Sequence, residues 1–355
     1  MFIFLKSIMP KVSVIVLIYE GKKFIKPVFD AIFAQTHKDL EVIAVINKST
    51  DGAKEAIQAN YSSVKIIDPG RNTGFAEGNN IGIKASTGEF IQLVNQDLIL
   101  EPNYIEEILK DFADLKVAAA TGKILRYNFD KNQKTKIIDT TGIIMQKSGR
   151  ARDRGQNQVD AGQFDNNDSR IVFGVSGAGP MYRRSALEQV KYCNPVFASE
   201  AKQSPPNEGI ASSPAAPRKD ENCEYFDENF FMYWEDVDLS WRLDNAAYIC
   251  AYIREAVAYH GRTAGQAAGG YLHLFKFIQH HKKLSPQVLR LNYKNHILMY
   301  LKNARHIWHP AFIFRELAML IYVIIFETRT LKVVPELWRQ IPQTWRKRHL
   351  QKKRP

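Results

Sequence analysis

The first hundred residues alternate between short apolar runs and segments with helical periodicity. The run at 12–18, VSVIVLI, is continuous and rich in β-branched residues, as is typical of a strand buried in a parallel sheet. Further strands are expected at 40–46, 64–67 and 89–94. The helical patterns between them lie at 27–35, from Ala53 onward and at 76–85. This alternation predicts an α/β fold in which a mostly parallel, doubly wound sheet is flanked by helices.

Polar residues follow the predicted strands. On doubly wound sheets, ligands bind beyond the carboxyl ends of the strands. A ligand site is therefore expected where four segments meet, namely 19–20, 47–52, 68–72 and 95–97.

Positive charge is concentrated in the C-terminal quarter of the chain. Residues 261–355 hold 18 Lys/Arg and 3 Asp/Glu, whereas residues 1–260 hold 31 and 34. This asymmetry indicates an anionic partner, either a nucleic acid or an acidic lipid surface. The longest apolar stretch, 317–326, has ten residues and is too short to span a bilayer.

The basic region is expected to be helical, with an amphipathic or interfacial helix at 311–326. Its Lys and Arg residues alternate with apolar runs and form no recognised nucleic-acid motif, which favours attachment to an anionic membrane surface and no nucleic acid partner. The protein is accordingly expected in the cytoplasm, peripheral at the inner face of the cell membrane. The alternative is that these helices pack on the rest of the protein or form a homo-oligomer interface.

Three cysteines, Cys193, Cys223 and Cys250, are an odd number and show no CxxC spacing. This argues against a disulfide framework or a zinc site and favours a reducing cytosol. Residues 194–222 are rich in Pro, Ser, Ala and charge without apolar periodicity, and are expected to be a disordered surface insertion. The opening residues 1–10 lack the pattern of a signal peptide, so none is expected.

Four motifs carry a resemblance to a known family: STDG at 49–52, NTGFAEGNNIGIKASTGEFIQLVNQD at 72–97, FFMYWEDVDLSWRL at 230–243 and YH at 259–260. In this order they resemble the donor-site and acid-bearing segments of family-2 glycosyltransferases, and the resemblance extends over residues 11–262. Rhamnosyltransferase-like members are the most similar, because they share DRG at 153–155, GQFD at 162–165 and FGVSGAGPMYRR at 173–184.

This resemblance implies a GT-A (Rossmann-like) domain over residues 1–262, with 194–222 as an insertion. The remainder, 263–355, would then be a basic, helical appendage associated with the membrane surface.

The implied reaction is an inverting sugar transfer, which needs one base to deprotonate the acceptor hydroxyl. Asp236 matches the family's base, and Glu235 beside it is expected to orient Asp236 or to contact the acceptor. Acidic residues at a helix start can also serve as a simple cap. However, three carboxylates in four positions with aromatic neighbours are more than a cap requires. Asp238 is expected to be structural.

The diphosphate that leaves the donor carries negative charge, which a divalent cation such as Mg²⁺ or Mn²⁺ commonly neutralises. Family members hold it with an Asp-x-Asp motif, but here the sequence is Asn95-Gln96-Asp97. Asp97 is therefore the expected metal ligand, and Asn95 is expected to bond the donor's ribose or sugar. By resemblance, His260 is the second ligand. The alternative for His260 is a hydrogen-bonded histidine at a strand end.

The resemblance also implies the residues that bind the nucleotide-sugar. Tyr19 and Glu20 stand where the family has Tyr-Asn against the base, and Asn72 and Gly74 let the backbone approach the donor. Asp51 and Gly52 are equally consistent with turn chemistry. The full expected set is Tyr19, Glu20, Asn47, Asn72, Gly74, Asn80, Asn95, Gln96, Asp97, Gly177 and Ala178.

By the same resemblance, the favoured donor is dTDP-rhamnose, with a UDP- or GDP-sugar as alternatives. The expected acceptor is a saccharide or a lipid-diphosphate-linked saccharide of surface polysaccharide synthesis. Two other functions remain open. One is a nucleotidyltransferase on a similar sheet, although the segment 19–23 has only one glycine. The other is a catalytically inactive relative that acts as a binding protein.

Overall fold

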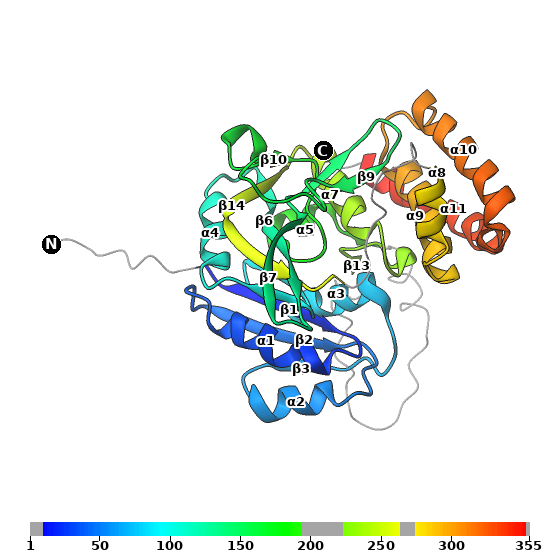
Figure 1. Ribbon diagram of the computed structural model, residues 1–355. Coiled ribbons are helices and arrows are strands. Elements are labelled where there is room, and N and C mark those ends of the chain that lie inside the picture. Colours follow the sequence, from blue (N-terminus) through cyan, green and yellow to red (C-terminus); the bar gives the residue numbers. More distant parts are fainter. Residues whose placement is uncertain (1–9, 194–222, 263–273, 353–355) are drawn as a thin grey trace, which may run out of the picture.

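The computed structural model describes residues 10–193, 223–262 and 274–352. The predicted insertion at 194–222 lies outside these residues. In the N-terminal part, strands and helices alternate as the apolar pattern predicts (Figure 1). The elements are β1 (Val12–Ile18), α1 (Lys22–Phe33), β2 (Leu40–Ile46), α2 (Ala53–Asn60), β3 (Lys65–Ile67), α3 (Gly74–Ala85) and β4 (Phe90–Asn95).

The next part of the chain contributes the other half of the main sheet. Its elements are β5 (Leu98–Leu100), α4 (Tyr104–Asp111), β6 (Val117–Asn128), β7 (Gln133–Thr140), β8 (Ile143–Met145), β9 (Ala151–Asp153), β10 (Ile171–Val172), β11 (Met181–Arg183) and α5 (Arg184–Val190). After these come β12 (Tyr192–Cys193), β13 (Cys223–Glu224), α7 (Glu235–Asn245) and β14 (Ile249–His260).

The main sheet has the order β10-β14-β6-β11-β4-β1-β2-β3. Strands β4, β1, β2 and β3 are parallel, and so are β6 and β14. The three-residue strand β11 runs antiparallel to both β4 and β6 and joins the two parallel groups. The sheet is therefore mixed, and the parallel part is the one that the sequence pattern predicts.

Helices cover both faces of this sheet. Alternate residues of β1 point to opposite sides, so Val14 and Val16 belong to one apolar core and Ile15 to the other. Helices α1, α2 and α4 pack into the first core, and α3, α5 and α7 into the second. A Cβ at Gly82 of α3 would overlap with Ile15, so this glycine permits close helix–strand packing. The carboxyl ends of β1, β2 and β4 are thereby fixed along one edge of the sheet.

The pairing of β5 with β14 brings two distant parts of the chain together. β5 runs antiparallel to the end of β14, so that His260 is opposite Leu98. The amide of Gly261 also donates to the carbonyl of Asp97 at 2.9 Å. His260 therefore lies beside the Asn95-Gln96-Asp97 turn, although 163 positions separate His260 from Asp97.

The C-terminal part is helical, as predicted, and packs against α7. It consists of α8 (Leu274–His281), α9 (Pro286–Asn303), α10 (Pro310–Phe326) and α11 (Val334–Lys352), with a 3-10 segment at Thr328–Val333 before α11. α9 contacts α7, and α11 packs on α9, while α10 lies at the outside of this group (Figure 1). Among the described helices, none has both the length and the apolar character needed to cross a bilayer.

Some of the basic residues of the C-terminal part form ion pairs inside the protein. Lys302 is fully buried and forms ion pairs with Asp227 and with Asp238, the latter at 2.8 Å. Lys347 of α11 also pairs with Asp227, at 2.6 Å. Fewer positive charges of residues 261–355 are therefore available to an external anionic partner than the sequence count suggests.

Cys193 and Cys223 form a disulfide, which corrects the expectation of free thiols. They face each other in the two-stranded ribbon of β12 and β13, which brackets residues 194–222. The expectation failed because spacing along the chain gives no information about which distant residues a fold pairs. Cys250 is free and buried in the second core.

Candidate active site

The His260 ring lies between two carboxylates. Its Nε2 is 3.1 Å from Asp97 Oδ1, and its Nδ1 is 2.8 Å from Asp139 Oδ2. Burial alone would lower the pKa of His260, but hydrogen bonds to Asp139 and Asp97 raise it to about 9. Asp139 is itself buried, and its bond to His260 holds the pKa of its carboxyl below the ordinary value in spite of that burial. The sequence predicted Asp97 and His260 together, and the fold brings them together.

The residues around His260 fit a divalent cation in part. Asp139 can accept a hydrogen bond from Nδ1–H, and a cation that displaces the proton of Nε2 would then bind to this nitrogen, as in carboxylate–histidine–metal arrangements. Two neighbouring ligands of one ion, each at about 2.1 Å from it, lie roughly 3 Å apart, close to the observed 3.1 Å. Within the described ranges, no cluster of three or more His, Cys, Asp or Glu side chains could hold an ion. Other ligands would have to come from the donor and from water.

Arg262 connects this pair of residues to a neighbouring pocket. Its guanidinium donates to Asp139 at 3.1 Å and to Asp153 at 3.2 Å. Burial raises the pKa of Asp153, although the charge of Arg262 opposes that shift. The sequence analysis missed Asp139, Asp153 and Arg262. Arg262 could have been found, because it is two positions after His260, but no local pattern distinguishes Asp139.

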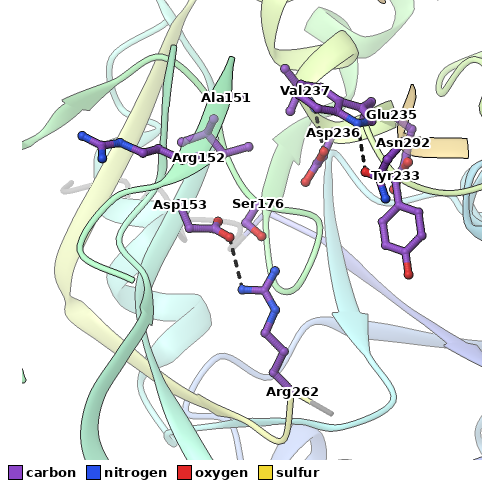
Figure 2. A pocket seen from close by; sticks show the side chains of 12 residues that line it. Ala151, Arg152, Asp153, Ser176, Tyr233, Glu235, Asp236, Val237, Arg262 and Asn292 are labelled. Atoms are coloured by element: carbon purple, nitrogen blue, oxygen red, sulfur yellow. Dashed lines mark hydrogen bonds and ion pairs between the residues drawn. The ribbon is translucent and has the colours of Figure 1, made fainter. Parts of the chain in front are cut away.

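The pocket beside Arg262 has a volume of about 180 Å³ (Figure 2). Asp153 and Arg262 form one side of it, and Glu235 and Asp236 at the start of α7 form another, with Ser176 between them. The pocket thus holds both residues that the sequence predicted to be catalytic. Its further lining is Ile143, Ala151, Arg152, Tyr233, Trp234, Val237 and Asn292.

Asp236 is held in place by backbone amides. Its Oδ2 accepts from the N–H of Gly177 at 2.9 Å, and its Oδ1 from the N–H of Val237 at 2.8 Å. Burial raises the pKa of Asp236 to about 6, helped by repulsion from Asp153 and opposed by the Gly177 amide. A carboxylate with such a pKa is ionised at pH 7 and is a stronger base than an exposed aspartate.

Glu235 has a different environment from its neighbour. It is buried, and its Oε2 has no hydrogen-bond partner among the described residues. Burial, with repulsion from Asp236, raises the pKa of Glu235 well above its ordinary value. Adjacent acids of this kind divide into one proton donor and one base. Glu235 is therefore suited to donate a hydrogen bond to a ligand in the pocket.

The backbone before α7 adopts an unusual conformation. Phe231, Tyr233 and Trp234 all have positive φ angles, of 62°, 69° and 76°, which is uncommon for residues other than glycine. The side-chain amide of Asn295 in α9 donates to the carbonyls of Phe230, Met232 and Tyr233 at 2.9 Å each. Strained backbone of this type persists where surrounding contacts fix it, often at functional sites.

Gly74 meets this same segment from the opposite side. The amides of Phe75 and Ala76 donate to the carbonyl of Phe231 at 2.6 and 3.1 Å. Gly74 has a φ of +73°, and a Cβ there would overlap with the carbonyl oxygen of Phe231. Gly74 therefore allows the start of α3 to approach the segment before α7 closely. The close approach of Gly74 to a donor, which the sequence suggested, stays a prediction.

Tyr19 and Glu20 lie at the carboxyl end of β1, as predicted. The Tyr19 side chain is 50% exposed. The side-chain amide of Gln96 fixes the backbone of Tyr19. It accepts a hydrogen bond from the Tyr19 N–H at 2.8 Å and donates one to the Tyr19 carbonyl at 3.1 Å. Glu20 accepts from both the amide and the hydroxyl of Thr50 at 3.0 Å. An exposed aromatic ring on a fixed backbone is suited to stacking on a base.

Hydrogen bonds of Asn47 and Asn72 stabilise the loop before α3. Asn47 is buried and accepts from the amide and hydroxyl of Thr73 at 2.6 and 2.8 Å. Asn72 accepts from the amide of Gly74 at 2.9 Å. These contacts fix the loop, and the contacts of Asn47 and Asn72 with the donor stay predictions.

Asn80 likewise forms hydrogen bonds within the protein. It is fully buried, donates to the carbonyl of Phe226 at 2.8 Å and accepts from the amides of Tyr225 and Phe226 at 3.2 and 2.8 Å. With both ends of its amide bonded, Asn80 positions the segment that leads to α7. Its contact with the donor stays a prediction.

The loop at Gly177 and Ala178 connects the two parts of the site. Gly177 donates to Asp236, and the carbonyl of Ala178 accepts from the amide of Asn95 at 2.9 Å. Asn95 in turn lies with its Nδ2 3.5 Å from His260 Nε2. The candidate base and the Asn95-Gln96-Asp97 turn are thus held by one loop.

Two curated relatives match parts of this chain. Glycosyltransferase GlyG of Streptococcus pneumoniae serotype 4 is 28% identical over 134 residues, which is 37% of this chain and 44% of GlyG. Glycosyltransferase GlyA of the same organism is 26% identical over 122 residues, 33% of this chain and 17% of GlyA. The matched regions thus span less than half the length of these relatives.

Solved structures of two glycosyltransferases share the fold. Staphylococcus aureus TarS 1–349 in complex with UDP-GlcNAc has a TM-score of 0.50 at 15% identity, and covers 87% of this chain and 73% of its own. GalNAc-T7 with UDP, GalNAc and Mn²⁺ has a TM-score of 0.54 at 11% identity, with 83% and 48% covered. The predicted GT-A architecture is thereby confirmed, with helices following it.

The sequence profile of "Glycosyl transferase family 2" matches residues 13–191, half of the chain, and includes the Asn95-Gln96-Asp97 turn and the loop that holds Asp236. The chain therefore belongs to glycosyl transferase family 2.

Proposed function

We propose that this protein is an inverting glycosyltransferase that uses a nucleotide-sugar donor and a divalent cation. The observation that carries this proposal is the position of Asp236. Its carboxylate lies in a pocket, with a pKa of about 6, and the same pocket contains Arg262. Through Asp139, Arg262 connects to the Asp97–His260 pair. The candidate base therefore shares a pocket with Arg262, and Arg262 contacts the carboxylate that orients the candidate cation ligand His260.

In the proposed reaction, Asp236 takes the proton from an acceptor hydroxyl in the pocket. The hydroxyl oxygen attacks the anomeric carbon, and the bond from that carbon to the diphosphate oxygen breaks. Attack opposite the leaving group inverts the configuration at this carbon. Protonated Glu235 donates a hydrogen bond that orients the acceptor. Arg262 and Asp153 fix the opposite wall of the pocket.

Asp97 and His260 would hold the cation, with Asp139 orienting the imidazole. The cation would neutralise negative charge on the diphosphate. Asn95 stands next to His260, from where its amide can bond the donor. Tyr19 would stack on the base of the nucleotide. The Mn²⁺ and UDP in the GalNAc-T7 structure and the UDP-GlcNAc in the TarS structure are consistent with this type of donor site.

The donor sugar is proposed from sequence resemblance alone. Similarity to rhamnosyltransferase-like members favours dTDP-rhamnose, transferred to a saccharide or lipid-diphosphate-linked saccharide of surface polysaccharide synthesis.

We also propose that α10 lies on an anionic membrane surface, at the inner face of the cell membrane. Its outward face is apolar, and Phe314 is 77% exposed. The exposed apolar side chains of α10 are Ile313, Phe314, Leu317, Leu320, Ile321, Ile324, Ile325 and Phe326. Directly after α10, Arg329 and Lys332 are exposed and can reach headgroups.

Incubation with a panel of dTDP-, UDP- and GDP-sugars, with Mn²⁺, Mg²⁺ or EDTA, tests the enzymatic proposal. We expect slow donor hydrolysis that requires the cation, and faster turnover when an acceptor is present. Proton NMR of the transferred sugar should show inversion. Absence of hydrolysis and transfer with every donor would favour the inactive relative, and release of diphosphate from a nucleoside triphosphate would favour a nucleotidyltransferase.

A further inference from the structure

A second cavity adjoins the pocket that contains Asp236. It has a volume of about 230 Å³ and lies among α8, α9, α10 and the 3-10 segment after α10. Two residues, Trp234 and Asn292, line both this cavity and the pocket. The Trp234 Nε1 donates to Asn292 Oδ1 at 3.1 Å, and this pair stands where the two spaces meet. A ligand that extends past Trp234 would therefore enter the cavity.

Apolar side chains supply much of the wall of this cavity. α9 contributes Leu289 and Tyr293, and α10 contributes Met319 and Val323, four positions apart on its inner face. Phe277 of α8, Leu284 and the ring of Trp234 are the other apolar side chains of the lining. A cavity of roughly 150 Å³ with such a lining is large enough for benzene, so this one accommodates a short apolar chain.

The charged groups of the cavity are matched within the protein. Glu327 Oε1 lies 2.5 Å from His281 Nδ1, and this bond lowers the pKa of Glu327 in spite of its burial. Glu316, next to Arg315, lies 3.0 Å from the ring of His296. Since Glu327 and Arg315, the acidic and the basic side chain among the lining residues, each have a partner within the protein, the cavity does not demand an ionic ligand. An uncharged apolar group is the ligand that this lining fits.

We propose that this cavity binds the apolar aglycone of the acceptor while the acceptor's sugar occupies the pocket at Asp236. The inference rests on the proposed sugar transfer. It names the acceptor as an amphiphile with an uncharged apolar group next to its sugar, in place of a lipid-diphosphate-linked saccharide, whose sugar adjoins a charged diphosphate. It also gives α10 two roles. The inner face lines the acceptor cavity, whereas the outer face, opposite on the same helix, carries the exposed apolar side chains.

Pairs of simple glycosides test the proposal. Hexyl and methyl glycosides of glucose, galactose, N-acetylglucosamine and rhamnose are titrated into the full-length protein by calorimetry, below the concentration at which the hexyl chains aggregate. At least one hexyl glycoside should bind more tightly than its methyl counterpart. Each methylene that enters the cavity should increase affinity about three- to fourfold. Equal affinity of hexyl and methyl glycosides in every pair would overturn the proposal.

Met319→Phe fills the cavity from α10, and Leu289→Phe fills it from α9. Either change should reduce the preference for the hexyl glycoside at least tenfold and leave the affinity for the methyl glycoside unchanged. Leu317→Phe is the matched control, because Leu317 is on the exposed face of α10. An unchanged hexyl preference in both folded cavity variants would contradict the proposal, as would loss of that preference in the Leu317 control.

Donor hydrolysis, measured on the same samples, separates this inference from the proposed function. If hexyl binding shows the expected pattern but no nucleotide-sugar is hydrolysed or transferred, the cavity assignment stands and the proposed function fails. If sugar transfer occurs equally well to hexyl and methyl acceptors in the wild type and both cavity variants, the proposed function stands and the cavity assignment fails.

Discussion

Asp139 accepts a hydrogen bond from His260 Nδ1 at 2.8 Å, across 121 positions of the sequence. This contact fixes both the orientation and the tautomer of the imidazole, so that Nε2 faces Asp97. Asp139 is almost completely buried and also accepts from Arg262. A side chain that would never touch the donor therefore determines how the candidate cation site is arranged.

The first prediction concerns this contact. Asp97→Ala and His260→Ala should abolish cation-dependent donor binding, whereas Asp139→Asn should weaken it about 10- to 100-fold, the usual effect of losing a residue that orients a metal ligand. Calorimetry of donor binding with Mn²⁺ and with EDTA measures this. Asp160→Asn serves as a control, because Asp160 pairs with Lys123 instead. Donor binding that is indifferent to both EDTA and these changes would show that no cation takes part.

The second prediction concerns Asp236 as the base. Asp236→Asn should lower turnover about 10²-fold or more and leave donor binding intact. A base must be deprotonated to act, so wild-type turnover should rise with pH up to about 6, the pKa to which burial raises this carboxyl, and then level off. Near-normal turnover of Asp236→Asn would move the role to Glu235, because Asp238 is buried in an ion pair with Lys302. Glu235→Gln should be milder, because a neutral amide can still donate a hydrogen bond.

The third prediction concerns the disulfide. Without reductant, the protein should show one buried thiol, that of Cys250, and unfolded protein treated with reductant should show three. Cys193→Ser should lower the free energy of unfolding by about 2–4 kcal/mol, the usual contribution of a disulfide. Denaturant titration with and without dithiothreitol measures this, and the serine variant should not respond to reductant. Three reactive thiols in the unreduced, unfolded protein would disprove the pairing.

The fourth prediction concerns the buried ion pairs of Lys302. Lys302→Met should destabilise the protein by about 3–5 kcal/mol, because the buried cluster loses one positive charge and, among the described residues, Asp227 and Asp238 keep only Lys347 and Arg242 as ionic partners. The exposed Lys332→Met is the control and should have little effect. Burial would raise the pKa of Asp227, but Lys302 and Lys347 hold it far below the ordinary value.

This pKa shift also predicts the pH dependence of the loss. A carboxyl with a depressed pKa in the folded state stabilises the protein above the pKa of the unfolded state, about 4, and that stability is lost as pH falls. The difference between wild type and Lys302→Met should therefore shrink below about pH 4. A difference that is the same at pH 3 and pH 7 would contradict this explanation.

The fifth prediction concerns the outer face of α10. The protein should float with anionic liposomes at low salt and less so at high salt, because roughly 1 kcal/mol per basic residue near the surface is screened. The double change Leu317→Asp and Ile321→Asp should reduce binding at least tenfold, since it places two carboxylates in the apolar face. Leu115→Asp, at a still more exposed position outside α10, should not. A wild-type protein that stays in solution at low salt would refute membrane attachment.

Truncation before α10 would be a poor test of the same point. Such a cut removes Lys347 together with α11, and with them the ion pair to Asp227. Loss of flotation could then reflect unfolding of the acid-bearing segment, so point changes on the exposed face are preferable.

The sequence by itself determined the layout of the fold, and it named the acids that are candidates for the active site. The run at 12–18 is a strand because β-branched residues without a polar position suit burial on both sheet faces, and this information is local. Tyr19, Asn95 and Asp97 were expected at one sheet edge because each follows a parallel strand. Asp236 and His260 were found by resemblance, which needs only short motifs in the right order.

Only the tertiary structure decided which charges are active and which are structural. Nothing near Asp139, Asp153 or Lys302 in the chain indicates that the first orients His260, that the second faces Asp236 across a pocket, or that the third is buried. Asn80 matched a family motif, yet its amide is bonded to the backbone at Phe226. Burial and pairing are set here by contacts between residues thirty or more positions apart. The pKa of a carboxyl and the partner of a cysteine follow from such contacts, which no local pattern of residues contains.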